Sequence, residues 1–529
     1  MKALKNLEDL FAKGKISRRQ FLTRAAALGM ASALPVSLLA KPSHASKPKR
    51  GGRLRMGLTG ASTADDLDLG GACCDSWELN ITFQTRNCLV EIDAGGRPIP
   101  ELAESWESTP NAAKWIFKIR RSVEFHNGKS LDADDVVYSL NHHRGEQSKS
   151  SAKSLITFIK DIKADGKYNV VFDLDYGYAD MPALMADYHF QIVPAGHENW
   201  QDGLGTGGYV LKDFEPGVRA FSVRNPNYWK GGRAHFDEIE CIGIHDTSAR
   251  VNALKTGEID LMDEPDLKTA SILNKQSGIQ VLSVTGLRHY TIPMLTNVAP
   301  FDNNDARLAL KYAVDREMLL KVILQGYGSV GNDHPIAPSN RYYASELEQR
   351  KYDPEKAKYH LKKAGLEGHT FELHTADAAY TGAVDTAMLI REGANKAGID
   401  IKVVREPDDG YWTNVWRKKP WSFCYWSGRV VEDMMFSTAY AADAAWNDAN
   451  WKHERFNKLL VEARQELDDA KRREMYVEMQ RIVRDEGGTV VHLWANSVFA
   501  ATTKLKYEEP QAGHFELDGQ KLTEKWWFA

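Results

Sequence analysis

Alternating hydrophobic and polar residues predict several β-strands in the first half of the chain. Trp115, Phe117 and Ile119 fall on one face at period two, which is typical of a half-buried strand. Similar short runs predict strands at residues 51–58 and 169–174, and a hairpin of residues 209–214 with 220–224. The strands alternate irregularly with helices, so the pattern favours a mixed α/β or α+β fold.

Apolar residues recur at helical spacing through most of the second half. Asp132, Asp315 and Asp353 are typical residues for the start of a helix. One apolar stripe runs from residue 456 to Leu467, and another runs through residues 476–483. We interpret these stripes as faces buried in the core.

Two glycine-containing segments resemble nucleotide-binding loops but lack the required context. Residues 203–208 satisfy the dinucleotide pattern of glycines, yet a predicted strand follows them where a helix N-terminus must meet the pyrophosphate. The segment Gly128-Lys129-Ser130 resembles the end of a phosphate loop, but Val123 occupies the position of its first glycine. Neither segment predicts a nucleotide site.

The first 45 residues have the three parts of an export signal. Lysines lead to the adjacent pair Arg18-Arg19, a mildly apolar stretch follows, and small residues end at Ala45. Two adjacent arginines before a weakly apolar run are typical of twin-arginine export. The apolar run contains Pro35 and is shorter than the ~20 residues that span a bilayer. We therefore predict a twin-arginine signal peptide at residues 1–45, the twin-arginine translocase as export partner, and a protein free in the periplasm.

The charge balance argues against nucleic acid as a partner. The chain has 68 Lys and Arg against 72 Asp and Glu, a formal net charge of −4, and no dense basic tract. Removal of the basic signal peptide makes the remainder more acidic. A length of 529 residues with 43% hydrophobic content suggests two or three domains.

The reactive side chains form no recognisable catalytic or metal-binding motif. Five cysteines are few and odd in number, which argues against a disulfide scaffold but leaves one bridge open. The adjacent His142 and His143 point to different faces, unlike helical metal ligands at i and i+4. The sequence also has no Gly-x-Ser-x-Gly or His-Glu-x-x-His motif. We therefore predict no catalytic residue, no metal site and no cofactor.

Several signatures, in order along the chain, resemble one known family. They are Trp115-x-Phe-x-Ile-Arg-x-x-Val-x-Phe125-His126-x-Gly128, the run from Leu131 to Ser139, Gly205-Thr206-Gly207-Gly208-Tyr209, the run from Arg224 to Trp229, Phe301-Asp302-Asn303, Tyr312-Ala313-Val314-Asp315-Arg316, Asp353-Pro354-Glu355-Lys356-Ala357 and the C-terminal pair of predicted helices. Together they resemble the peptide-binding family of ABC-importer solute-binding proteins, the dipeptide, oligopeptide and nickel group. Gly208 departs from the proline that is common there.

The resemblance implies a two-lobed clamshell like that of periplasmic binding proteins, α/β (α+β) in class, with an additional subdomain on lobe one. It places lobe one at residues 46–85, 205–294 and 495–529, the subdomain at 86–204 and lobe two at 295–494. The chain would cross between the lobes near residues 293–297 and 493–496. Such proteins close over a ligand, so polar groups at the interface must satisfy the ligand's charged ends.

The aromatic-rich segment from residue 411 to 426 is the expected ligand-binding wall. Aromatic side chains provide large contact area at low entropic cost. We expect most of its six Tyr and Trp residues to lie in the core and one or two, with Trp426 first, to face the cleft. The expected ligand-binding residues are Tyr425, Trp426, Ser427, Gly428, Arg429 and Asp433.

Arg429 is the main departure from the family pattern. In peptide-binding relatives an aspartate lies three positions after the tryptophan and binds the free amino group of the peptide. A guanidinium at this position favours a carboxylate or phosphate instead. Arg429 either contacts an anionic or amino-blocked end of the solute, or pairs with Glu432 or Asp433 and only shapes the loop. These two carboxylates could also take the role of the missing aspartate.

The resemblance predicts a binding component of an ABC importer that delivers its solute to a membrane permease. The expected solute is a short peptide or related amino-acid derivative, and the alternative is a non-peptide anionic solute such as an opine-like conjugate. A chemoreceptor-coupled or chaperone-like protein of the same fold and a periplasmic hydrolase are further alternatives. We expect a monomer without enzymatic activity.

Overall fold

The computed structural model describes residues 48–71, 76–444 and 446–529. The predicted signal-peptide positions Arg18, Arg19 and Ala45 lie outside the described residues, as do Cys73 and Cys74. Residues 48–529 form one unit.

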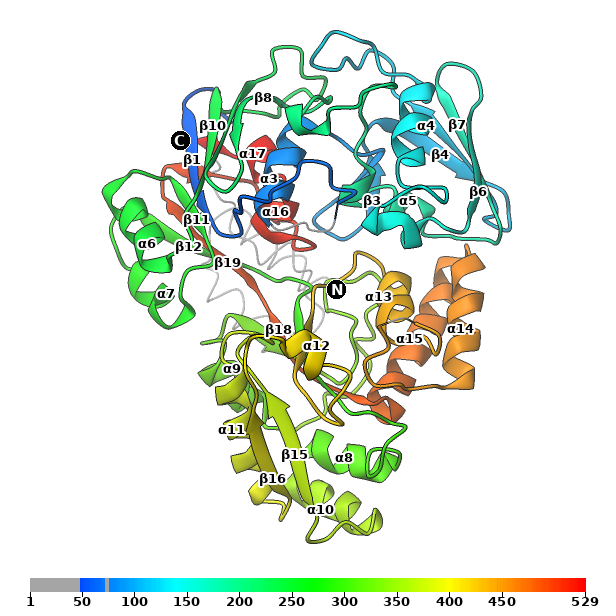
Figure 1. Cartoon of the computed structure of the whole chain (residues 1–529), viewed down its shortest axis with the longest axis vertical. Coiled ribbons are helices and arrows are strands. Elements are labelled where there is room, and N and C mark those ends of the chain that lie inside the picture. The colour runs from blue at the N-terminus through cyan, green and yellow to red at the C-terminus, as the bar shows by residue number, and fades with distance from the viewer. Residues whose placement is uncertain (1–47, 72–75, 445) are drawn as a thin grey trace, which may run out of the picture. The chain divides into compact units, whose positions relative to one another are not determined.

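A seven-stranded mixed sheet combines strands from both ends of the described chain (Figure 1). Its central strand β1 is parallel to β10 and β11, and its side chains Leu54, Met56 and Leu58 are fully buried. In sheet order the strands are β12 (Ile279–Val284), β19 (Ser497–Thr502), β11 (Leu261–Asp263), β1 (Arg53–Leu58), β10 (Glu238–Gly243), β9 (Arg219–Arg224) and β8 (Tyr209–Glu215). Helices α3 (Ser76–Thr85), α6 (Thr247–Thr256) and α7 (Leu267–Leu273) contact this sheet.

Residues 90–190, here called the subdomain, contain a four-stranded antiparallel sheet. Trp115, Phe117 and Ile119 on β5 are buried, which confirms the predicted period-two strand. In sheet order the strands are β4 (Ala103–Ser108), β5 (Lys114–Ile119), β7 (Asn169–Leu174) and β6 (Ile159–Ala164). The other elements are the hairpin β2 (Val90–Ile92) and β3 (Pro98–Pro100), helices α4 (Ala133–Asn141) and α5 (Met181–Leu184), and 3₁₀ turns at Ser151–Leu155 and Tyr188–Phe190, with a further turn after the subdomain at Trp200–Asp202.

A second four-stranded sheet, entirely antiparallel, organises the second half of the chain. Its strands in order are β14 (Gly328–Val330), β18 (Thr489–Ala495), β13 (His289–Pro293) and β17 (Cys424–Trp426). A separate parallel pair is formed by β15 (Thr370–Thr375) and β16 (Asp400–Arg405). The helices of this half are α8 (Asn304–Tyr312), α9 (Arg316–Val322), α10 (Pro354–Lys363), α11 (Ala383–Asn395), α12 (Tyr411–Asn414), α13 (Glu432–Ala439), α14 (Glu454–Gln465) and α15 (Asp469–Glu486).

The C-terminal segment returns to the first sheet. β18 ends at Ala495 in the second sheet and β19 begins at Ser497 in the first, so the chain changes sheets at Asn496 (Figure 1). After β19 come β20 (Leu505–Lys506), α16 (Glu516–Gly519), α17 (Leu522–Lys525) and β21 (Trp527–Phe528).

The other change of sheet occurs earlier than the expected crossing at residues 293–297. β12 ends at Val284 in the first sheet, and β13 begins at His289 in the second because it pairs with β17 and β18. The strand His289–Pro293 therefore lies with the second sheet, although the resemblance placed it in lobe one.

Most predicted helix starts are confirmed, and one predicted helical position is wrong. Asp315 and Asp353 accept backbone N–H groups at the starts of α9 and α10, and Asp132 is the N-cap of α4. Leu467, expected on the buried face of a helix, is 44% exposed because α14 ends at Gln465. The glycines at 203–208 are followed by the strand β8, as expected for a segment that is not a nucleotide loop.

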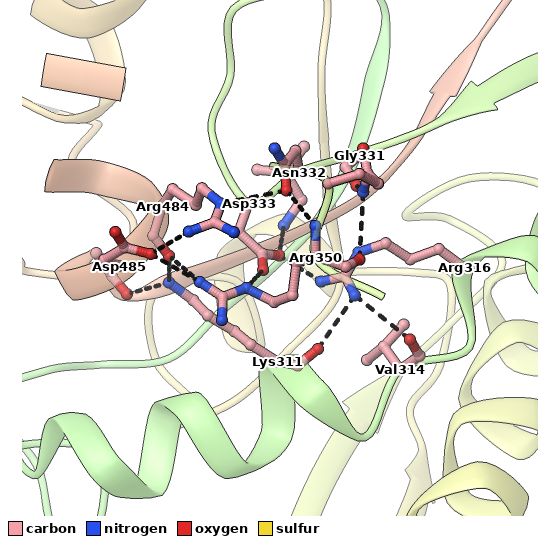
Figure 2. Close-up of polar contacts among 12 residues, drawn as sticks. Lys311, Val314, Arg316, Gly331, Asn332, Asp333, Arg350, Arg484 and Asp485 are labelled. Atoms are coloured by element: carbon pink, nitrogen blue, oxygen red, sulfur yellow. Dashed lines mark hydrogen bonds and ion pairs between the residues drawn. The ribbon is translucent and has the colours of Figure 1, made fainter. Parts of the chain in front are cut away.

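A buried cluster of charges ties the helices of the second half together (Figure 2). Asp333 is fully buried and forms ion pairs of 2.6 Å with Arg316 and 2.8 Å with Arg350. Lys311 on α8 donates to the carbonyl oxygens of Arg484 and Gly487 at the end of α15. Breaking such buried pairs is costly, so these contacts hold the helices of this half together.

Candidate ligand-binding site

The expected ligand-binding residues begin on β17, the edge strand of the second sheet. β17 pairs with β13 so that His289 lies opposite Trp426 and Tyr290 lies opposite Tyr425. Successive side chains of a strand point to opposite faces. Tyr425 is accordingly 36% exposed, whereas Trp426 is buried at 6% exposure.

Trp426 is buried rather than open to a cleft. Its indole Nε1 donates to Asp448 Oδ2 at 3.1 Å, and its ring packs in a core cluster of the second half. Burial raises the pKa of Asp448 to about 6. Trp426 therefore supports the wall from inside.

The exposed aromatic side chains of the predicted wall are Trp412 and Tyr425. Trp412 is 40% exposed, and its ring lies 5.7 Å from that of Tyr425 in an edge-on arrangement. Tyr411 and Trp421 are buried in the core. Two of the six Tyr and Trp residues in this segment are thus available to a solute.

The loop after β17 packs tightly against the segment that joins the two sheets. A Cβ atom on Gly428 would lie 1.8 Å from Leu287 Cβ and 2.6 Å from the Leu287 carbonyl oxygen. Leu287 lies between β12 and β13 and packs with Trp494. The absence of a side chain at Gly428 therefore fixes the position of this loop, in which Ser427 is exposed.

Arg429 is half-buried and folds back on its own loop. Its Nη1 donates to the carbonyl oxygens of Ser427 at 2.9 Å and Gly428 at 3.3 Å. Burial opposes ionisation of Asp187, but His189 and, more weakly, Arg429 lower the pKa of that carboxyl overall. Arg429 therefore lies within electrostatic reach of the subdomain.

Neither nearby carboxylate pairs with Arg429 in the described residues. Asp433 is buried and forms a 2.8 Å ion pair with Arg464 on α14. Glu432 is buried and accepts the backbone N–H of Tyr342 at 2.7 Å. Arg429 therefore contacts backbone carbonyl groups of its own loop instead, and the Asp433 carboxylate is paired with Arg464.

Arg288 is the residue that the sequence reasoning missed. It lies where the chain passes from the first sheet to the second, and its guanidinium is 5.8 Å from the centre of the Tyr425 ring. Its Nη1 lies 3.5 Å from Glu264 and its Nη2 lies 3.8 Å from Glu516. Only the folded chain brings these segments together, and no local motif marks Arg288.

The structure thus places Arg288 beside Tyr425, and Ser427, Gly428 and Arg429 follow in the loop after β17. A solute at this wall would meet an aromatic surface and charges of both signs. No group of His, Cys, Asp and Glu side chains within the described ranges is arranged to hold a metal ion. Cys88, Cys241 and Cys424 are buried free thiols.

Comparison with known proteins identifies the family. The model for bacterial extracellular solute-binding proteins, family 5 (middle region), matches residues 97–448, which is more than half of the chain. The chain belongs to this family. It is the substrate-binding component of an ABC importer, and it works in the periplasm, as do relatives such as the nickel-binding periplasmic protein of Escherichia coli.

Two curated relatives illustrate the range of solutes in the family. Heme-binding protein A of Haemophilus influenzae is 31% identical over 53% of this chain and 56% of its own length. The dipeptide-binding protein of Escherichia coli is 27% identical over 77% of this chain and 82% of its own length.

Solved structures confirm the two-lobed fold. DppA from Helicobacter pylori, in complex with the peptide STSA, has a TM-score of 0.73 and 23% identity, covering 91% of this chain and 99% of that protein. AgaA from A. tumefaciens R10, in complex with agropinic acid, has a TM-score of 0.73 and 24% identity, covering 90% and 99%. Among the described helices none has the length and apolar character to span a membrane.

Proposed function

We propose that the protein captures a short peptide or a related amino-acid derivative against the wall of Tyr425, Ser427 and Arg288, and delivers it to the permease. The observation that carries this proposal is the position of Arg288 between Glu264 and Glu516 and beside the exposed Tyr425 ring. A peptide presents a carboxylate, which can pair with Arg288, and an ammonium group, which can pair with Glu264 or Glu516. The dipeptide- and oligopeptide-binding relatives support this solute class.

A non-peptide anionic solute, such as an opine-like conjugate, is the second candidate. By the family resemblance, Arg429 occupies the position where peptide-binding relatives carry an aspartate, and a guanidinium there favours an anionic or amino-blocked end. The complex of AgaA with agropinic acid shows that the fold accommodates such a ligand.

We propose that the two lobes correspond to the two large sheets. Lobe one comprises the first sheet and its C-terminal return, the subdomain is attached to it, and lobe two contains the second sheet. The chain crosses between Val284 and His289 and again at Asn496. Closure of the lobes as rigid bodies about these crossings buries the solute.

Export through the twin-arginine translocase is testable with a conservative substitution. Arg18→Lys with Arg19→Lys keeps the charge but removes the paired guanidinium groups. We expect an unprocessed precursor to accumulate in the cytoplasm, measured by fractionation and immunoblotting. Normal periplasmic delivery of the double variant would exclude this route.

We further propose that the protein is a monomer that binds its solute without converting it. Native mass spectrometry of the exported protein, incubated with a defined mixture of short peptides, tests both the solute class and the absence of catalysis. We expect a one-to-one complex with an intact peptide or amino-acid derivative. Release of cleaved peptides would indicate a hydrolase instead.

Tyr425→Ala provides the matched variant for this experiment. Removing the exposed ring should lower the affinity for the captured solute by about tenfold or more, as for an aromatic contact at the centre of an interface. Tyr359→Ala is the control, since Tyr359 on α10 is 62% exposed and outside the wall. If calorimetry gives equal affinities for the two variants, the solute does not bind at Tyr425 on β17.

A further inference from the structure

A cavity separate from the wall of Tyr425 lies between the subdomain and the second half of the chain. Its volume is about 210 Å³, far above the ~10–15 Å³ that one water molecule requires on the same measure. Trp106 and Trp115 line one side, and Tyr342, Glu432 and Leu467 line the other. The cavity therefore has room for a small organic molecule.

Most charged groups that line the cavity are already neutralised by a neighbour. Asp180 is paired with Arg472 across the cavity, with Nη1 at 2.7 Å from Oδ1. Arg341 is paired with Asp469 at 2.6 Å. These two ion pairs neutralise four of the charged residues that line the cavity.

Glu432 and Glu466 are the exceptions, and of the two only Glu432 is buried. Its side chain is only 2% exposed, yet no Lys, Arg or His in the described residues lies within ion-pair distance of it. The Glu432 carboxylate accepts the backbone N–H of Tyr342 at 2.7 Å. A buried carboxylate without a cation is unfavourable, and burial raises the pKa of Glu432 to about 7. The neighbouring Glu466 adds a second negative charge at the rim.

We propose that this cavity binds a small organic cation, with its ammonium group against Glu432 and its apolar part against Trp106 and Trp115. An ammonium would supply the missing counter-charge, and the indole rings favour a cation with an apolar body. The two walls belong to the subdomain and to lobe two, so an occupant also stabilises their contact. The site is distinct from the solute wall and goes beyond the proposed function.

The test uses three probes of matched shape on the exported protein. 3-Methylbutylamine carries one ammonium, 3-methylbutanol replaces it with a neutral hydroxyl, and 4-methylpentanoate carries a negative charge. Calorimetry at pH 8, where both the amine and Glu432 are charged, should show binding of the amine at least tenfold tighter than that of the alcohol. No measurable binding of the carboxylate is expected. Equal affinity for amine and alcohol, or no binding of the amine, overturns the proposal.

Two variants assign the binding to the cavity. Glu432→Gln removes the charge but keeps an acceptor for the Tyr342 N–H. It should lower the affinity for the amine at least tenfold. Leu467→Arg places a cation at the exposed rim without disturbing the core, so it should also lower the affinity for the amine. This variant tests the proposal even if Glu432→Gln folds poorly. Unchanged amine affinity in Leu467→Arg overturns the proposal.

Tyr425→Ala separates the cavity from the solute wall. The proposal predicts that this variant binds the amine as the parent protein does, while its capture of solute is weakened. Loss of amine binding in Tyr425→Ala would place the amine at the solute wall and overturn the second site. Failure of peptide capture with retained amine binding would instead contradict only the proposed function.

Discussion

Asp180→Ala should weaken solute binding by about a hundredfold or more. Asp180 precedes α5 in the subdomain, and it pairs with Arg472 on α15 through two contacts in which both side chains are at least 90% buried. Removing one partner of a buried pair typically costs about 3–5 kcal/mol because the other charge remains unpaired. Since the pair joins the subdomain to lobe two, this cost falls on the closed state, and each 1.4 kcal/mol is tenfold in affinity.

The neighbouring ion pair on the same helix provides the control. Arg473 pairs with Glu346 at 2.8 Å, but both side chains are at least 40% exposed. Glu346→Ala should change binding and stability by less than about 1 kcal/mol, as for other exposed pairs. Calorimetric titration and thermal unfolding of both variants measure the two effects. A drop in the melting temperature of unliganded Asp180→Ala with unchanged affinity would show that the subdomain and lobe two never separate.

Gly428→Ala should destabilise the protein and disturb the solute wall together. The new methyl group would overlap the side chain and the carbonyl oxygen of Leu287 in the segment that joins the two sheets. Overpacking of this kind costs about 1–3 kcal/mol. Because Gly428 lies between Tyr425 and Arg429, relief of the overlap displaces both, and solute affinity should fall with stability.

An unconstrained glycine separates this effect from the general cost of replacing glycine. A Cβ atom on Gly231 meets no atom within 4 Å, and its backbone requires no positive φ. Gly231→Ala should leave denaturant unfolding and solute affinity unchanged. If Gly428→Ala behaves in the same way, the loop is not held by Leu287 and the wall is more adaptable than the structure indicates.

Local signals in the sequence were sufficient for the elements but not for the wall. The side chains of Asp315 and Asp353 accept backbone N–H groups of the helices that they begin, which depends only on neighbouring residues. The same holds for the alternation at Trp115 and Phe117. Leu467 kept the apolar spacing of its helix, but no local signal marked the end of α14 at Gln465.

Which of the two adjacent residues of β17 is exposed could not be predicted from the sequence, because it depends on the pairing with a distant strand. Tyr425 and Trp426 are adjacent aromatic residues, and a shift of one residue in register would exchange their exposure. Pairing with β13 sets that register. Arg288 was missed for a related reason, since its contacts Glu264, Tyr425 and Glu516 come from segments far apart in the sequence.

Solution scattering of the exported protein, with and without the peptide that it retains in native mass spectrometry, tests closure over a solute most directly. A solute that binds only the closed state adds about 2.7 kcal/mol of stability at a hundredfold excess over Kd. The account predicts a smaller radius of gyration and a higher melting temperature in the complex than in the unliganded protein. A tightly bound solute with an unchanged radius of gyration would contradict it.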